Sequence, residues 1–196
     1  MPRSRSFDPD RVLAAAQRVF HTRGYEGTSV QDLVDATGLG RSSLYHAYGD
    51  KHGLFLAVLD RYVEAGERRA EDWCDGGPPL AVIRALLEAA ARPASPDAPG
   101  CLLVNATAER ASVDPDTADR ADRVRTAQHD RFERLVRDAQ ASGAVASERS
   151  ASDLARLLST VAYGLRGLQT AGADADELAT VVDGAVDAIT SEGASA

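Results

Sequence analysis

Residues 28–48 read TSVQDLVDATGLGRSSLYHAY. The first part of this stretch, Val30–Thr37, has the apolar spacing of a short helix with one buried face. Gly38-Leu39-Gly40 interrupts the pattern, and Arg41–Tyr48 forms a second short segment that ends before Gly49. The stretch therefore predicts two short helices that are joined by a tight turn containing glycine.

Similar helix signals continue on both sides of this stretch. Pro9 at a first helical position and Gly24 after a last one predict a helix over about 9–23. Thr28 or Ser29 can cap the next helix, and Gly and Pro gather in the breaks at 75–79 and 92–99. Alanine occupies 36 positions, which favours helix, and no convincing strand pattern is found. The sequence predicts an all-α fold of about nine helices.

The helix over 41–48 has one small apolar side, and most of its remaining side chains carry groups that can donate or accept hydrogen bonds. A helix-turn-helix unit places such a second helix in the major groove of DNA, where polar groups meet phosphates and base edges. An ordinary helical hairpin with a polar outer face fits the spacing equally well. The polar residues are Arg41, Ser42, Ser43, Tyr45, His46 and Tyr48.

Three segments resemble the N-terminal domain of the tetracycline-repressor (TetR) family of bacterial regulators. They are Gly24–Val30, Thr37–Tyr48, and Lys51 with Leu54-Phe55, within a match over about residues 7–58. Tyr48 stands where the family usually has Phe, and Gly49 follows where a larger or polar residue is common.

The resemblance implies a role for each polar residue. Thr28 and Ser29 would meet phosphate, Arg41, Ser42 and Ser43 would face the groove, Tyr45, His46 and Tyr48 would contact backbone or base edges, and Lys51 would reach phosphate. It also implies a helix-turn-helix domain over residues 1–52, with the motif at about 29–48, and an effector-binding and dimerisation domain over 53–196.

The charge distribution agrees with a small anion-binding module on an acidic body. The net charge is −8, yet residues 1–51 hold seven bases and six acids, whereas the remaining residues hold fifteen bases and twenty-four acids. The net negative charge argues against a protein that coats nucleic acid without regard to sequence. No apolar run is long enough for a membrane span or a secretory signal, so we expect a cytoplasmic protein that makes no membrane contact.

The last two predicted helices carry wide apolar stripes. In TetR-like proteins the corresponding helices form a four-helix dimer interface, and a homodimer suits a palindromic operator. The alternative is that both stripes are buried in the core of one chain. The expected interface residues are Leu154, Leu158, Val161, Leu165, Val182 and Val186.

Candidate pocket residues combine aromatic, thiol and polar side chains. They are Tyr62, Trp73, Cys101, Asn105, His129, Tyr163 and Gln169. Cys101, expected in the first turn of a helix, resembles an electrophile-sensing cysteine of some TetR-like regulators, although a buried structural thiol is the alternative. The His and Cys spacings do not predict a metal site, and no cofactor is expected.

These features predict a homodimeric repressor that a small-molecule effector releases from palindromic double-stranded DNA. A small all-helical enzyme or cofactor-binding bundle is an alternative, but the sequence contains no convergent set of nucleophile, base and orienting group. An architectural DNA-binding protein without a ligand is the other alternative, and it would leave the acidic part of the chain without a role.

Overall fold

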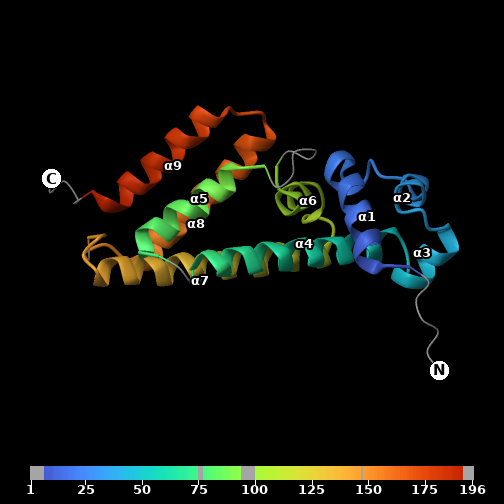
Figure 1. Cartoon of the computed structure of the whole chain (residues 1–196), viewed down its shortest axis with the longest axis horizontal. Helices are drawn as coiled ribbons and strands as arrows, with labels where there is room; N and C mark the ends of the chain where they lie inside the picture. Colours follow the sequence, from blue (N-terminus) through green and yellow to red (C-terminus); the bar gives the residue numbers. More distant parts are fainter. Residues whose placement is uncertain (1–6, 75–76, 94–99, 147, 192–196) are drawn as a thin grey trace, which may run out of the picture.

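The computed structural model describes residues 7–74, 77–93, 100–146 and 148–191. Within these ranges the chain forms nine helices and no strand, which confirms the predicted all-α fold (Figure 1). The helices are α1 (Pro9–Arg23), α2 (Val30–Thr37), α3 (Arg41–Tyr48), α4 (Lys51–Cys74), α5 (Pro79–Ala91), α6 (Leu102–Arg110), α7 (Pro115–Ala141), α8 (Ala151–Thr170) and α9 (Ala175–Thr190).

Side-chain caps mark the beginnings of several helices. Asp8 accepts a hydrogen bond from the backbone N–H of Asp10 at 3.0 Å, and Asp174 accepts one from that of Glu177 at 2.8 Å. Ser150 begins α8 in the same way. Each such cap contributes about 1 kcal/mol to helix stability and fixes the first residue of its helix.

The first hydrophobic core lies among α1, α2, α3, the beginning of α4, and α6. Phe20 of α1 packs edge-on against Phe55 of α4, with ring centroids 5.1 Å apart. Leu33 and Leu44 come from the two short helices, and Leu102 comes from α6. The helix-turn-helix region therefore shares its core with a helix that lies far away in sequence.

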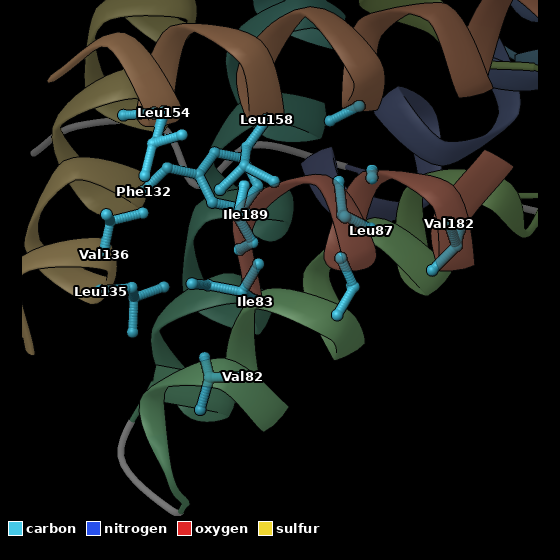
Figure 2. Packing of buried hydrophobic residues seen from close by; sticks show 14 of the residues in the cluster. Val82, Ile83, Leu87, Phe132, Leu135, Val136, Leu154, Leu158, Val182 and Ile189 are labelled. Atoms are coloured by element: carbon cyan, nitrogen blue, oxygen red, sulfur yellow. The ribbon is translucent and has the colours of Figure 1, made fainter. Parts of the chain in front are cut away.

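The second core lies among α5, α7, α8 and α9. Ile83, Phe132, Leu158 and Ile189 meet there, each from a different helix (Figure 2). Their relative exposure is 2% or less, so this core holds the C-terminal half together.

Helix α4 connects the two cores and extends along the molecule away from α1 (Figure 1). Its Leu54, Phe55, Val58 and Leu59 are buried in the first core, and Cys74 at its other end packs against the second. The domain division expected between residues 52 and 53 falls in the first turn of this continuous helix.

Candidate functional site

Helix α3 presents a polar surface to solvent. Leu44 anchors the helix with 3% exposure, while Arg41, Ser42, Ser43 and His46 are exposed. Tyr45 is exposed as well, and the Arg41 guanidinium lies 6.0 Å from the centre of its ring. One face of α3 is thus free to contact another molecule through hydrogen bonds.

The turn between α2 and α3 is fixed by its glycine. Gly38 has φ +71° and ψ 8°, a left-handed conformation that is energetically unfavourable for any residue with a side chain. Its N–H donates to the Val34 carbonyl and so ends α2. Leu39 then packs against the first core. This geometry sets the angle between the two short helices.

Ser29 and Thr28, both expected to meet phosphate, lie in different environments. Ser29 is exposed and forms a capping box with Asp32, whose pKa is lowered by hydrogen bonds from the hydroxyl and the backbone N–H of Ser29. Thr28 is 1% exposed, and its hydroxyl donates to the Gly24 carbonyl at 2.6 Å. Burial contradicts a phosphate contact by the Thr28 side chain.

Lys51 also faces inward, contrary to the expectation that it reaches phosphate. Its Nζ donates to the carbonyl oxygens of Tyr25 at 2.9 Å and Thr28 at 2.8 Å, and it lies 4.2 Å from the centre of the Tyr25 ring. The Lys51 ammonium therefore holds the turn between α1 and α2. Tyr48, the other inward residue, is half-buried and packs against the first core.

A cavity of about 1020 Å³ lies among α4, α5, α6, α7 and α8. Six of the seven predicted pocket residues line it, and Asn105 does not. Asn105 lies on a different side of α6 from Leu103, Val104 and Thr107, which form part of the wall. A volume of this size can hold a drug-sized molecule.

Two polar contacts shape the wall near Cys101. The Tyr62 hydroxyl donates to Cys101 Sγ at 3.5 Å, and burial raises the pKa of Tyr62 above its ordinary value. The Gln169 Oε1 accepts from the Gly100 N–H at 2.7 Å. Cys101 is the N-cap of α6 rather than a residue of its first turn, and it is 9% exposed.

The end of α6 holds the turn that leads into α2. The two carboxylate oxygens of Glu109 accept from the N–H groups of Tyr25 and Glu26, each at 2.8 Å. A side chain at Gly24, which has φ +71°, would place its Cβ 2.8 Å from that carboxylate. Arg110 pairs with Glu26 and lies 4.3 Å from the centre of the Tyr25 ring.

Among the residues that the structure describes, two groups of imidazole and carboxylate side chains come close enough together to hold a metal ion. One comprises His52, Asp114 and Asp116, and the other comprises His129, Asp130 and Glu133. Hydrogen bonds within the chain account for the first group, since His52 Nε2 lies 2.9 Å from Asp114 Oδ2. We assign no metal to either group.

Comparison with known proteins gives matches over most of the chain. Residues 12–58 match the family described as "Bacterial regulatory proteins, tetR family", and residues 79–185 match "Tetracyclin repressor-like, C-terminal domain". The repressor ComR of Escherichia coli is 32% identical over 184 residues, covering 90% of this chain and 86% of that protein. The chain belongs to the TetR family.

Other TetR-family proteins match over similar lengths. The uncharacterized regulator YezE of Bacillus subtilis is 32% identical over 187 residues, covering 93% of this chain and 96% of that protein. A cysteine mutant of the regulator CifR, solved with 26-base-pair double-strand operator DNA, is 34% identical with a TM-score of 0.79. That match covers 95% of this chain and 99% of the CifR chain.

Membership of the TetR family confirms the predicted class of function. The chain is a DNA-binding transcriptional regulator and not an enzyme. TetR-family regulators are dimers that bind double-stranded operator DNA and effectors, as expected from the sequence. In the part of the chain that the structure describes, no helix has the length and apolarity to cross a membrane.

The expected dimer interface of this TetR-family chain needs correction. Leu154, Leu158, Leu165, Val182 and Val186 are all buried in the second core of a single chain, so another subunit cannot reach them. Only Val161 of the predicted set is half-buried at the edge of that core. The apolar stripes were identified correctly, but their partners are α5 and α7 of the same chain.

Sequence reasoning also missed the arginines of the cavity and the contact of α6 with the α1–α2 turn. The arginines are separated in sequence and lie on three different helices, α4, α7 and α8, and on the segment after α5. The Glu109 contact joins residues that are 84 positions apart. No local pattern indicates either feature, because both depend on how distant helices pack.

Proposed function

We propose that two copies of this chain bind one palindromic operator in the cytoplasm, and that a small molecule in the cavity releases them. Helix α3 of each copy would enter the major groove, with its five exposed polar side chains toward the bases and phosphates. The observation that carries the proposal is that α6 contacts both the cavity and the helix-turn-helix region. It forms part of the cavity wall and also holds the turn before α2.

The exposed residues of α3 suit recognition of base edges. An arginine reads the O6 and N7 atoms of guanine with two hydrogen bonds, which makes Arg41 the candidate for sequence specificity. Ser42, Ser43 and His46 carry hydrogen-bond donors and acceptors that fit phosphates and bases. Lys51 supports this surface from behind by fixing the turn between α1 and α2.

Release requires an effector that binds more tightly to the form of the protein that does not fit the operator. Leu103, Val104 and Thr107 of α6 line the cavity, and Glu109 and Arg110 lie two to seven residues further along the same helix. A ligand that displaces α6 therefore also displaces the turn at Tyr25 and Glu26. This displacement would change the spacing of the two α3 helices in a dimer.

The outer face of α8 and α9 is the proposed dimer surface. Leu157 is 37% exposed, and Val161, Gly164 and Leu168 follow it at intervals of one helical turn. Apart from its chain neighbours and the adjacent backbone of its own helix, Gly164 has no atom within 4 Å of the position of a Cβ, so a second helix can approach there. Gly184 on α9 is open in the same way.

Selection from a pool of random double-stranded DNA tests the proposal. We expect the full chain to enrich an inverted repeat, because two α3 helices related by a two-fold axis read two half-sites. Arg134→Ala removes an exposed arginine of α7 away from α3 and serves as the control for Arg41→Ala. Enrichment of a single half-site, or of the same repeat by Arg41→Ala with undiminished affinity, would contradict the proposal.

A further inference from the structure

The cavity is basic although the chain is acidic. Six arginines and two acidic residues line it, whereas the whole chain has 22 bases and 30 acids. The arginines are Arg69, Arg92, Arg125, Arg131, Arg156 and Arg166, and the acidic residues are Glu67 and Asp122.

Both acidic residues of the wall are already neutralised. Glu67 pairs with Arg131, and Asp122 pairs with Arg125. Within the described ranges, no carboxylate lies within ion-pair distance of Arg166, which is half-buried. A cationic ligand would thus find excess positive charge and no uncompensated carboxylate in this cavity.

Arg166 lies in a small polar cluster between α7 and α8. Its Nη1 donates to Gln128 Oε1 at 3.3 Å and to the carbonyl of Ala162 at 3.4 Å. Both bonds are long, and both acceptors are uncharged. The guanidinium thus retains donors for a stronger, charged acceptor.

Ser159 adds an unsatisfied polar atom to the same wall. Its hydroxyl oxygen is buried and has no hydrogen-bond partner, while its carbonyl accepts from Gln128 Nε2 at 3.3 Å. A buried hydroxyl without a partner costs free energy, which a ligand that accepts its proton would recover. Arg166, Gln128 and Ser159 therefore converge on one region of the cavity.

The rest of the wall is largely apolar. Leu86 of α5, Leu103 of α6 and Phe132 of α7 contribute hydrophobic surface, and Trp73 of α4 contributes an aromatic ring. A bound molecule would therefore place a hydrocarbon or aromatic body against these side chains and a charged end near Arg166.

We propose that the effector is an amphipathic organic anion, whose carboxylate or similar acidic group binds Arg166 together with Ser159 and Gln128. This inference rests on the proposed function, because it names the class of molecule that fills the effector cavity. A carboxylate takes two parallel hydrogen bonds from a guanidinium, and the low dielectric constant of the partly buried site strengthens both.

Three probes with one hydrocarbon body and different ends test the proposal. Decanoate, decan-1-ol and decylamine are titrated separately into the full chain, below the concentrations at which they aggregate. Fluorescence of Trp73 reports binding, since it is the single tryptophan and lines the cavity. We expect decanoate to bind at least about tenfold more tightly than decan-1-ol, and decylamine to bind most weakly.

Arg166→Gln should bring the affinity for decanoate down to that for decan-1-ol and leave the affinity for decan-1-ol unchanged. Arg134→Gln, which removes an exposed arginine outside the cavity, should keep the wild-type order. If Arg166→Gln does not fold, the order of the three probes on the wild-type chain still decides. Equal affinities, preference for decylamine, or no binding of any probe would overturn the inference.

Operator release is measured separately with the selected DNA. Tight decanoate binding without release would support the anion site and contradict its role as the effector site. Release by decan-1-ol or decylamine but not by decanoate would support the proposed function and overturn the present inference. The two proposals therefore fail on different results.

Discussion

At the scale of single residues, Arg41 and Lys51 show that two basic side chains near the same surface can have opposite roles. Arg41 is exposed on α3, whereas the Lys51 ammonium binds two backbone carbonyls of the preceding turn. The direction of each side chain decides whether its charge is available to DNA.

Arg41→Ala should weaken binding to the selected operator by about 1–3 kcal/mol, because it removes the proposed contact with a guanine edge. Stability should stay within about 0.5 kcal/mol of wild type, since the side chain is exposed. Gel-shift titration and thermal unfolding measure the two quantities. Unchanged operator affinity in a folded Arg41→Ala protein would remove Arg41 from the recognition surface.

Lys51→Met should lower stability by about 1–3 kcal/mol, because two carbonyl oxygens in a partly buried turn lose a charged donor. Denaturant unfolding measures this change. The salt dependence of DNA binding should keep its slope, since the ammonium is not placed at a phosphate. A slope reduced by about one, with unchanged stability, would restore the phosphate contact expected from the sequence.

At the scale of elements, α6 and the start of α7 connect the cavity to the helix-turn-helix unit. The Glu109 carboxylate accepts hydrogen bonds from two backbone N–H groups of the α1–α2 turn. Asp114 is the N-cap of α7, and its Oδ2 lies 2.9 Å from Nε2 of His52 in α4. Both contacts join segments of the chain that are remote in sequence.

Glu109→Ala should expose the amide protons of Tyr25 and Glu26 to exchange with solvent, because the carboxylate is their acceptor. Hydrogen exchange of the peptide covering this turn measures the effect. Glu64→Ala is a matched control, since Glu64 is exposed and pairs only with Arg68 on its own helix. Equal exchange in both variants would show that α6 does not hold the turn.

The lowered pKa of the Asp114 carboxyl group predicts a loss of stability in acid. Burial by itself raises the pKa of Asp114, but hydrogen bonds from Thr117 and His52 outweigh it and lower the pKa below its ordinary value. A carboxyl group whose pKa is lower in the folded state stabilises the fold above its unfolded-state pKa and loses this contribution as the pH falls through its folded-state pKa.

We therefore expect unfolding free energy to fall as the pH is lowered from about 5 toward 2, and Asp114→Asn to be less stable at neutral pH with a flatter acid dependence. Denaturant titrations across this range measure both. Asp119→Asn, at an exposed position of α7, is the control and should follow wild type. An Asp114→Asn curve parallel to that of wild type would contradict the assignment.

At the scale of the whole molecule, two neighbouring leucines of α8 allow the folding of one chain and the association of two chains to be tested separately. Leu158 is fully buried in the second core, whereas Leu157 is 37% exposed on the proposed dimer surface. The pair offers the same chemical change at positions one residue apart.

Leu157→Glu should give a folded monomer with weak operator binding, because the new carboxylates would lose water in the dimer interface. Leu158→Glu should instead unfold the C-terminal half, at a cost of several kcal/mol for a carboxylate in the core. Sedimentation and circular dichroism distinguish these results. A Leu157→Glu protein that stays dimeric would place the interface elsewhere.

The helices and the helix-turn-helix unit could be predicted from the sequence, because their signals are local. Asp8 and Ser29 begin helices at the predicted places, Gly24 and Gly38 end them, and the resemblance within residues 7–58 identified the correct family. Caps, turn glycines and apolar spacing act within a few residues, so they can be recognised in a single chain.

The partner of each helix face depends on how the whole chain packs. An apolar stripe predicts burial but not the partner, which is why the stripes of Leu158 on α8 and Val182 on α9 were expected at another subunit, whereas both pack inside the second core of the same chain. Likewise, Lys51 finds its acceptors on a turn more than twenty residues away, and Arg166 lies in a cavity formed by five helices. Long-range packing sets these distances, and no short segment of sequence contains them.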